Sequence, residues 1–410
     1  MSQLAINGGE PVRSPLKTWP IWPMVTERAV ELVTEVVRSG EWAGGPKERQ
    51  LAETFAAFSG ARYCSPVANG TVAIQLALEA LDIGAYDEVI VPGLTWQATA
   101  AACIDVNAIP ILVDVDPETF CLDARQAEAA ITTRTRAIIV THLYGAMADM
   151  DAIAALARRH DLKLIEDCAH QHGSQWRGKG VGALGDVGAF SMQHSKVLPT
   201  GEGGLNLTDD WELYQRLYSL RNCGRLFRPT SPGVQSGNYR LTELQAALAL
   251  AHLEHLEEQV KQRDANAQYL NRLLAEVPGI LPMRRHAQVT RQSYYCFTFR
   301  YDASTWDGVP GRVFRKALAA EIGLGVSSTY EPLNNCSLYR PHTKRRYALN
   351  DDYWQAIDPA RFHLPACEHA YRDAAVVGHS FLLAGQADMD AVASAVQKLY
   401  DHRAELLTIE

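Results

Sequence analysis

Long hydrophobic runs, paired cysteines and an excess of basic residues are all missing from this 410-residue chain. No window approaches the ~18 uninterrupted apolar residues of a membrane span. The first nine residues also lack the basic patch and apolar run of a signal peptide. With 39 basic against 47 acidic residues, the net charge of -8 argues against nucleic-acid or anionic-membrane partners. We therefore expect a small-molecule substrate.

Disulfide and nucleotide-binding signatures are absent as well. The eight cysteines are scattered singly without a CxxC pair, which fits reduced thiols and predicts a cytoplasmic protein. The glycine spacings match neither the Walker loop nor the dinucleotide fingerprint. A hydrophobic content of 47% and a charged content of 21% are ordinary for a globular protein.

The order of apolar patterns predicts an α/β fold with two domains. Residues 1 to about 25 carry four prolines and read as an extended arm. From 63 to about 206, short apolar runs alternate with helical stretches, which predicts a mainly parallel sheet. One long helical stretch covers 242–275. We expect an N-terminal arm and large domain over 1–275 and a smaller α+β domain over 276–410.

One lysine, Lys196, stands out for its setting between an apolar segment that ends at Ser191 and the glycine-rich turn 201–204. This placement suits a chemically used amine better than a solvated surface charge. Asp167 directly follows a predicted buried strand, so it should lie at the carboxyl end of the sheet. A carboxylate isolated there is costly unless it meets a cation.

Two further segments could bind parts of a ligand. Gly70 and Thr71 precede a helical pattern, where free backbone amides and the helix dipole suit a phosphate. An ordinary threonine cap is the alternative interpretation. Trp96 follows a predicted strand and could offer its flat face to an aromatic ligand, or it could be a packed core indole.

The histidines near Asp167 leave other interpretations open. A metal site could form from Asp167, His170, His172 and His194, although no second carboxylate or cysteine pair completes it. The histidines could instead satisfy buried backbone groups.

Together these residues match the requirements of pyridoxal 5′-phosphate. That cofactor needs an aromatic face, an aspartate for its ring nitrogen, a helix N-terminus for its phosphate and a lysine for its aldehyde. Each signal is weak alone, but their order along the chain makes the set specific.

With these motifs, and with 238–247 (NYRLTELQAA), the chain resembles the DegT/StrS family of aminotransferases over essentially its full length. The resemblance implies a fold-type I pyridoxal-phosphate transferase in which Lys196 holds the cofactor and shuttles a proton. It further implies that Asp167 contacts the ring nitrogen of the cofactor and that His170 contacts the ring oxygen, where many relatives have glutamine. Gly70, Thr71 and Ser191 would contact the phosphate. The resemblance also implies a homodimer with shared active sites, in which Asn238 would contact the phosphate in the neighbouring subunit.

Segments 330–335, 341–347 and 379–383 resemble the subgroup that aminates cyclitol ketones in aminoglycoside biosynthesis. This implies a ping-pong transfer from L-glutamine to 2-deoxy-scyllo-inosose or a related ketone. The basic run with Lys344, Arg345 and Arg346 is either a solvated face or, beside Tyr330, a site for the glutamine carboxylate.

Three other functions stay open at this stage. The chain could aminate nucleotide-linked keto sugars, or it could be a dehydrating relative of the 3-amino-5-hydroxybenzoate synthase type. A lysine at position 196 disfavours the sugar dehydratases of the family, which have histidine there. A cofactor-binding regulator without turnover is disfavoured because no basic DNA-binding domain is present.

Overall fold

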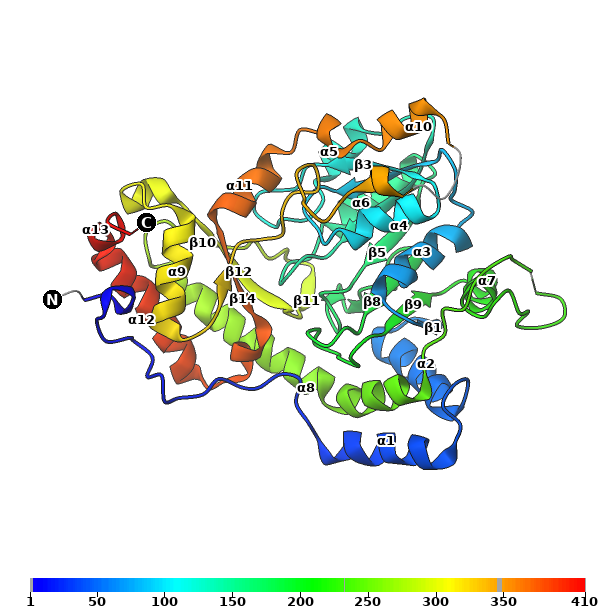
Figure 1. Cartoon of the computed structure of the whole chain (residues 1–410), viewed down its shortest axis with the longest axis horizontal. Helices are drawn as coiled ribbons and strands as arrows, with labels where there is room; N and C mark the ends of the chain where they lie inside the picture. Colours follow the sequence, from blue (N-terminus) through cyan, green and yellow to red (C-terminus); the bar gives the residue numbers. More distant parts are fainter. Residues whose placement is uncertain (1–2, 232, 345–348, 410) are drawn as a thin grey trace.

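The computed structural model describes residues 3–231, 233–344 and 349–409. A seven-stranded sheet forms the centre of one part of the molecule, and a four-stranded sheet with its helices forms the other (Figure 1). The long helix α8 (Glu243–Leu274) runs beneath both parts. In the described part of the chain, no helix combines the length and the hydrophobicity needed to cross a membrane.

The seven-stranded sheet confirms the predicted mainly parallel α/β fold. Its strands lie in the order β1 (Tyr63–Val67), β9 (Gly204–Thr208), β8 (Val187–Ser191), β5 (Lys163–Asp167), β4 (Thr135–Thr141), β2 (Glu88–Pro92) and β3 (Ile109–Val113). Every neighbouring pair from β8 to β3 is parallel, whereas β9 is antiparallel to both β8 and β1. Six strands therefore end at the same edge of the sheet.

Helices cover the sheet because its strands are apolar on both faces. All five residues of β2 and of β3 are buried, as expected for strands inside a parallel sheet. The helices of this part are α1 (Glu27–Ser39), α2 (Pro46–Ser59), α3 (Gly70–Ala80), α4 (Ala98–Asp105), α5 (Ala124–Ala129), α6 (Met150–Arg159) and α7 (Trp211–Arg221). A small sheet of β11 (Val289–Arg291), β6 (Gln175–Trp176) and β7 (Lys179–Gly180) is added.

Helix α8 matches the long helix predicted from the apolar spacing. It begins with a capping box, in which the Thr242 side chain accepts from the Gln245 backbone and the Gln245 side chain accepts from the Thr242 backbone. Its first half contributes Ala246 and Leu253 to the larger hydrophobic core, and its second half contributes Leu270 to the smaller one. One helix thus packs in both cores.

The second part is built on an antiparallel sheet in the order β10 (Ile280–Pro282), β12 (Cys296–Tyr301), β14 (Ala374–Gly378) and β13 (Val326–Ser327). Its helices are α9 (Gly311–Ile322), α11 (Pro365–Asp373), α12 (Gln386–Asp401) and α13 (Arg403–Leu406), whereas α10 (Asp351–Ala356) lies near the large sheet (Figure 1). Leu333, Tyr353 and Leu364 pack in the larger core, and Leu4 packs in the smaller core. The division at residue 275 stays a prediction.

Candidate active site

A cavity of about 740 Å³ opens where the parallel strands end. Side chains that follow β1, β2, β5 and β8 reach it, because the carboxyl ends of parallel strands share one edge of a sheet. The structure brings most of the residues predicted from the sequence into its wall: Gly70, Thr71, Trp96, Asp167, His170, Ser191, Lys196 and Tyr330. Residues separated by more than 200 positions in the sequence therefore form a single site.

Lys196 is fixed on the turn that follows β8. Its backbone N–H donates to the Gln193 carbonyl at 2.8 Å, and its Nζ lies 4.0 Å from the centre of the Tyr295 ring. Burial lowers the pKa of the Lys196 ammonium to about 8, although the Asp167 carboxylate raises it. Because the neutral amine is the nucleophile, this lowered pKa suits a lysine that forms covalent bonds near neutral pH.

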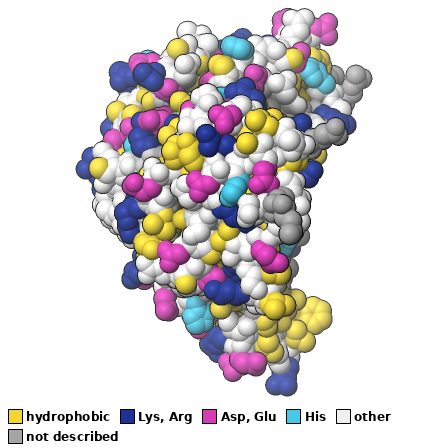
Figure 2. Space-filling model, turned by 90° about the vertical axis from the view of Figure 1, so that its left-hand side faces the viewer, with side chains coloured by type: hydrophobic (Ala, Val, Ile, Leu, Met, Phe, Trp, Pro, Cys, Tyr) yellow, Lys and Arg dark blue, Asp and Glu magenta, His cyan; other side chains and the backbone are white. Residues whose placement is uncertain are grey.

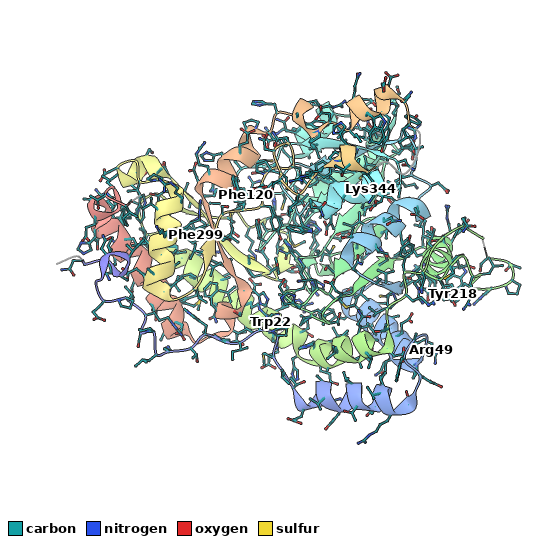
Figure 3. The ribbon with its side chains drawn as sticks, in the orientation of Figure 1. Trp22, Arg49, Phe120, Tyr218, Phe299 and Lys344 are labelled. Carbon is teal, nitrogen blue, oxygen red and sulfur yellow. The ribbon has the colours of Figure 1, made fainter. Side chains whose placement is uncertain are left out.

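Two distant segments hold the main chain at this lysine. Trp22 Nε1, from the N-terminal arm, donates to the Lys196 carbonyl at 2.9 Å. His379 Nε2, which follows β14, donates to the Ser195 carbonyl at 3.1 Å. The two rings meet edge to face at 4.8 Å, and Figure 3 labels Trp22 beside α8. The prolines of residues 1 to about 25 predicted an extended arm, but no sequence pattern indicated this contact with Lys196.

Asp167, the last residue of β5, also lines the cavity. Thr99 Oγ1 donates to its Oδ2 at 2.8 Å, and the Ala169 N–H donates to Oδ1 at 3.2 Å. Burial raises the pKa of the Asp167 carboxyl, while these two hydrogen bonds lower it. A buried acceptor held in this way is suited to a protonated nitrogen. No sequence motif pointed to Thr99, whose role depends on contact across 68 positions.

The start of α3 approaches Ser191 closely. Asn69 Oδ1 caps the helix by accepting from the Val72 N–H at 3.0 Å. A methyl group on Gly70 would lie only 2.6 Å from Cβ of Ser191, so only glycine fits there without movement of the backbone or Ser191. The start of α3, Thr71 and Ser191 therefore line the same cavity, an arrangement suited to a phosphate.

Aromatic side chains surround His170. Its ring stacks on Tyr295 with 4.2 Å between centres, and its Nδ1 accepts from the Tyr144 N–H at 3.1 Å. Burial lowers the pKa of His170 well below its usual value, so the neutral ring carries its proton on Nε2. That nitrogen lies 3.3 Å from the Tyr330 hydroxyl. The predicted contact between His170 and a cofactor oxygen stays a prediction.

Tyr295 is the most prominent residue that the sequence analysis missed. Its ring lies against Lys196 and His170, and its hydroxyl is 2.9 Å from Ser195 Oγ. It lies directly before β12. A tyrosine near a strand end carries no spacing signal, so only the tertiary structure could identify it.

The structure does not group the described residues that the sequence analysis considered for a metal site, which were Asp167, His170, His172 and His194. Among residues 3–231, 233–344 and 349–409, the group of three metal-ligand side chains is His142, Glu166 and Cys168. Glu166 already accepts from the backbone N–H groups of 182, 184 and 185 and lies 3.2 Å from His142 Nε2. Because backbone donors occupy this carboxylate, we interpret the group as a structural network.

Two of the remaining candidates, Lys344 and Asn238, are among the described residues. Lys344 forms an ion pair with Asp105, a residue of the cavity wall, and is labelled near α4 in Figure 3. Arg345 and Arg346 lie outside the described residues. Asn238 is exposed on the loop before α8 and does not line the cavity of its own chain.

The residues of the cavity fit each part of pyridoxal 5′-phosphate. The buried amine with its lowered pKa suits the aldehyde, and the buried carboxylate suits the ring nitrogen. The helix N-terminus suits the phosphate, and the aromatic wall suits the ring. Together with the parallel sheet, this set defines the class of fold-type I pyridoxal-phosphate-dependent transferases. Comparison with protein families gives the specific group. The DegT/DnrJ/EryC1/StrS aminotransferase family model matches residues 23–374. The chain belongs to this family, and it is an aminotransferase.

Individual relatives match over their whole length. The chain is 45% identical to L-glutamine:2-deoxy-scyllo-inosose aminotransferase of Streptoalloteichus tenebrarius, with 98% of the chain and 99% of the relative covered. It is 43% identical to the enzyme of the same name from Streptomyces fradiae, with 100% of both covered. Among solved structures, 3-amino-5-hydroxybenzoic acid synthase superposes with a TM-score of 0.82 at 31% identity, covering 95% of this chain and 99% of that one.

Proposed function

We propose that this protein transfers the amino group of L-glutamine to a cyclitol ketone, 2-deoxy-scyllo-inosose or a related compound, in aminoglycoside antibiotic biosynthesis. The strongest support is full-length similarity to enzymes with that name, combined with a single cavity that contains Lys196 and Asp167. A solved structure with a similar fold is named a 3-amino-5-hydroxybenzoic acid synthase and not an aminotransferase, so the fold alone does not identify the substrate. The substrate of this protein must therefore be tested directly.

We propose pyridoxal 5′-phosphate as the cofactor. When bound, it supplies an aldehyde for the amino group and a ring that accepts an electron pair from the substrate carbon. The amides at the start of α3, with Thr71 and Ser191, would hold its phosphate, and Asp167 would hold its ring nitrogen. Trp96, which is 46% exposed in the cavity wall, offers a face for its ring.

Lys196 would hold the cofactor and then act as acid and base in both halves of the reaction. Its pKa of about 8 lets one amine both take and return a proton near neutral pH. The fixed main chain at Ser195 and Lys196 limits where Nζ can move. Donor and acceptor would use the same lysine in turn, so we expect ping-pong kinetics.

We also propose a homodimer with shared active sites. Helix α1 leaves Val30 and Val37 about half exposed, and Val25, directly before it, is 87% exposed. A groove of about 390 Å³ lies between this region, Pro199 and Leu248. Figure 2 shows hydrophobic side chains gathered at the lower end of one face. An exposed apolar surface of this kind suits a second copy, whose site Asn238 could then reach.

The donor carboxylate needs a cation near the cavity. Lys344 is the described member of the basic run, and its pairing with Asp105 brings it to the cavity wall. Arginine and lysine are well suited to carboxylates. We therefore propose that this run, with Tyr330, binds the carboxylate of glutamine.

The experiment that tests this function is an acceptor panel with pyridoxal 5′-phosphate and L-glutamine. It compares 2-deoxy-scyllo-inosose, scyllo-inosose, an amino-cyclitol ketone and a nucleotide-linked keto sugar, and it measures release of the oxo acid and the aminated product. We expect turnover with a cyclitol ketone. Turnover with the nucleotide-linked sugar alone would replace this assignment, and release of a dehydrated product without amine transfer would indicate the synthase type of reaction.

A further inference from the structure

A second cavity of about 570 Å³ adjoins the first. The two share Thr95, Trp96, Tyr295 and Tyr330 in their walls. The second cavity extends toward β13, the loop 328–338 and Tyr371 of α11. Trp96 and Tyr330, whose ring centres are 5.4 Å apart, lie where the cavities meet. A molecule could thus contact the second cavity while its reacting carbon lies near Lys196.

The wall of this second cavity is rich in hydroxyl groups. Its hydroxyl-bearing side chains include Ser327, Ser328, Thr329, Tyr330, Ser337 and Tyr371. The described lining residues include one carboxylate, Glu331, and no lysine or arginine. The Ser328, Thr329 and Ser337 hydroxyls donate to oxygens of the protein, so they offer a ligand their oxygen lone pairs, and the carboxylate accepts as well. This chemistry suits an uncharged ligand with several hydroxyl groups better than a phosphorylated one.

Glu331 is held in a defined position in this wall. The Ser337 N–H and hydroxyl donate to its Oε2 at 2.8 and 2.9 Å. These hydrogen bonds lower the pKa of Glu331, so it is ionised at neutral pH. An ionised carboxyl group can accept about four hydrogen bonds. The two donors from Ser337 therefore leave capacity for a ligand hydroxyl.

We propose that the second cavity is the binding site for the ring hydroxyl groups of the ketone acceptor, and that Glu331 accepts a hydrogen bond from one of them. Trp96 and Tyr330 would face the carbon ring, since aromatic surfaces pack well against apolar C–H groups. The proposal builds on the aminotransferase function above and adds the location and chemistry of acceptor recognition. Glu331 would determine specificity without taking part in proton transfer.

The kinetic test separates the two half-reactions in the holoenzyme. Glu331→Gln keeps the size of the side chain and removes its charge, so we expect the acceptor KM to rise about tenfold or more. The half-reaction with L-glutamine should keep its rate. Glu276→Gln, on the exposed turn after α8, is the matched control and should leave both unchanged. The proposal would be overturned if Glu331→Gln left the acceptor KM unchanged. It would also be overturned if the substitution impaired the rate of the glutamine half-reaction as strongly as it impaired the acceptor half-reaction.

A binding measurement provides a readout independent of turnover. scyllo-Inositol has the ring hydroxyls but no ketone, and its binding to the holoenzyme can be followed by ligand-observed NMR. We expect binding to wild type and to Glu276→Gln, and at least about tenfold weaker binding to Glu331→Gln. Equal binding by all three proteins would overturn the proposed subsite. If wild type bound scyllo-inositol but aminated no cyclitol ketone, the proposed function would fail while the subsite stood.

Discussion

Replacing Gly70 with alanine tests the phosphate end of the site. The added methyl group would lie 2.6 Å from Ser191 Cβ and 3.1 Å from both Ser191 Cα and Oγ. Heavy atoms at 2.6 Å overlap strongly, so α3 or the end of β8 must move apart. Both segments line the cavity where we place the phosphate.

Two opposing effects set the size of the result. Alanine favours a helix over glycine by about 0.5–1 kcal/mol, and Gly70 begins α3. Overpacking a filled space costs about 1–3 kcal/mol. We therefore expect a net loss of up to ~2 kcal/mol, or a fall in Tm of about 2 °C for a chain of this size. Affinity for pyridoxal 5′-phosphate should fall as well, because the phosphate donors are displaced.

Thermal unfolding and cofactor titration measure both effects. Gly325→Ala is the matched control, because a methyl group there meets no atom within 4 Å. It should keep the Tm and cofactor affinity close to those of wild type. If Gly70→Ala were as stable and bound the cofactor as tightly as Gly325→Ala, the close approach of α3 to Ser191 would not be a requirement of the site.

The remaining predictions concern Lys196. In protein without cofactor, the rate of acylation of Lys196 can be followed by peptide mass spectrometry as the pH is varied. The midpoint of this pH dependence should lie near pH 8 instead of the ordinary ~10.4, because a lowered pKa frees the amine at lower pH. A midpoint above 10 would refute its burial. Asp167→Asn should lower that midpoint, because the carboxylate raises the pKa of Lys196; an upward shift would contradict this. Trp22→Phe should reduce kcat severalfold by removing the donor to the Lys196 carbonyl, whereas Trp19→Phe, which loses a bond to Ile322, should not. Equal kcat values for these two variants would exclude the role of Trp22.

The architecture was largely predictable because local patterns determine it. Alternating apolar runs and helical stretches predicted the parallel sheet, and the long helical pattern over 242–275 predicted α8. The position of Asp167 at a strand end followed from the same reasoning. The antiparallel direction of β9 did not, because strand direction depends on pairing between distant segments.

The cavity was predictable only in part. Residues within recognisable motifs, such as Gly70, Ser191 and Lys196, line it as expected. Tyr295 and Trp22 contact the lysine from segments about 100 and 174 positions away in the sequence, and no local spacing reports such contacts. Residues in motifs can be found from the sequence, but the partners that position them require the structure.

The central claim is that pyridoxal 5′-phosphate would be held by Lys196, and that the amino group of glutamine would displace this lysine from the cofactor and free its amine. Borohydride reduction of the cofactor-loaded protein, followed by peptide mass spectrometry, tests it most directly. We expect the cofactor on the peptide that contains Lys196, and prior incubation with L-glutamine should prevent the attachment. Attachment at a different lysine, or labelling of Lys196 that glutamine does not reduce, would contradict the account.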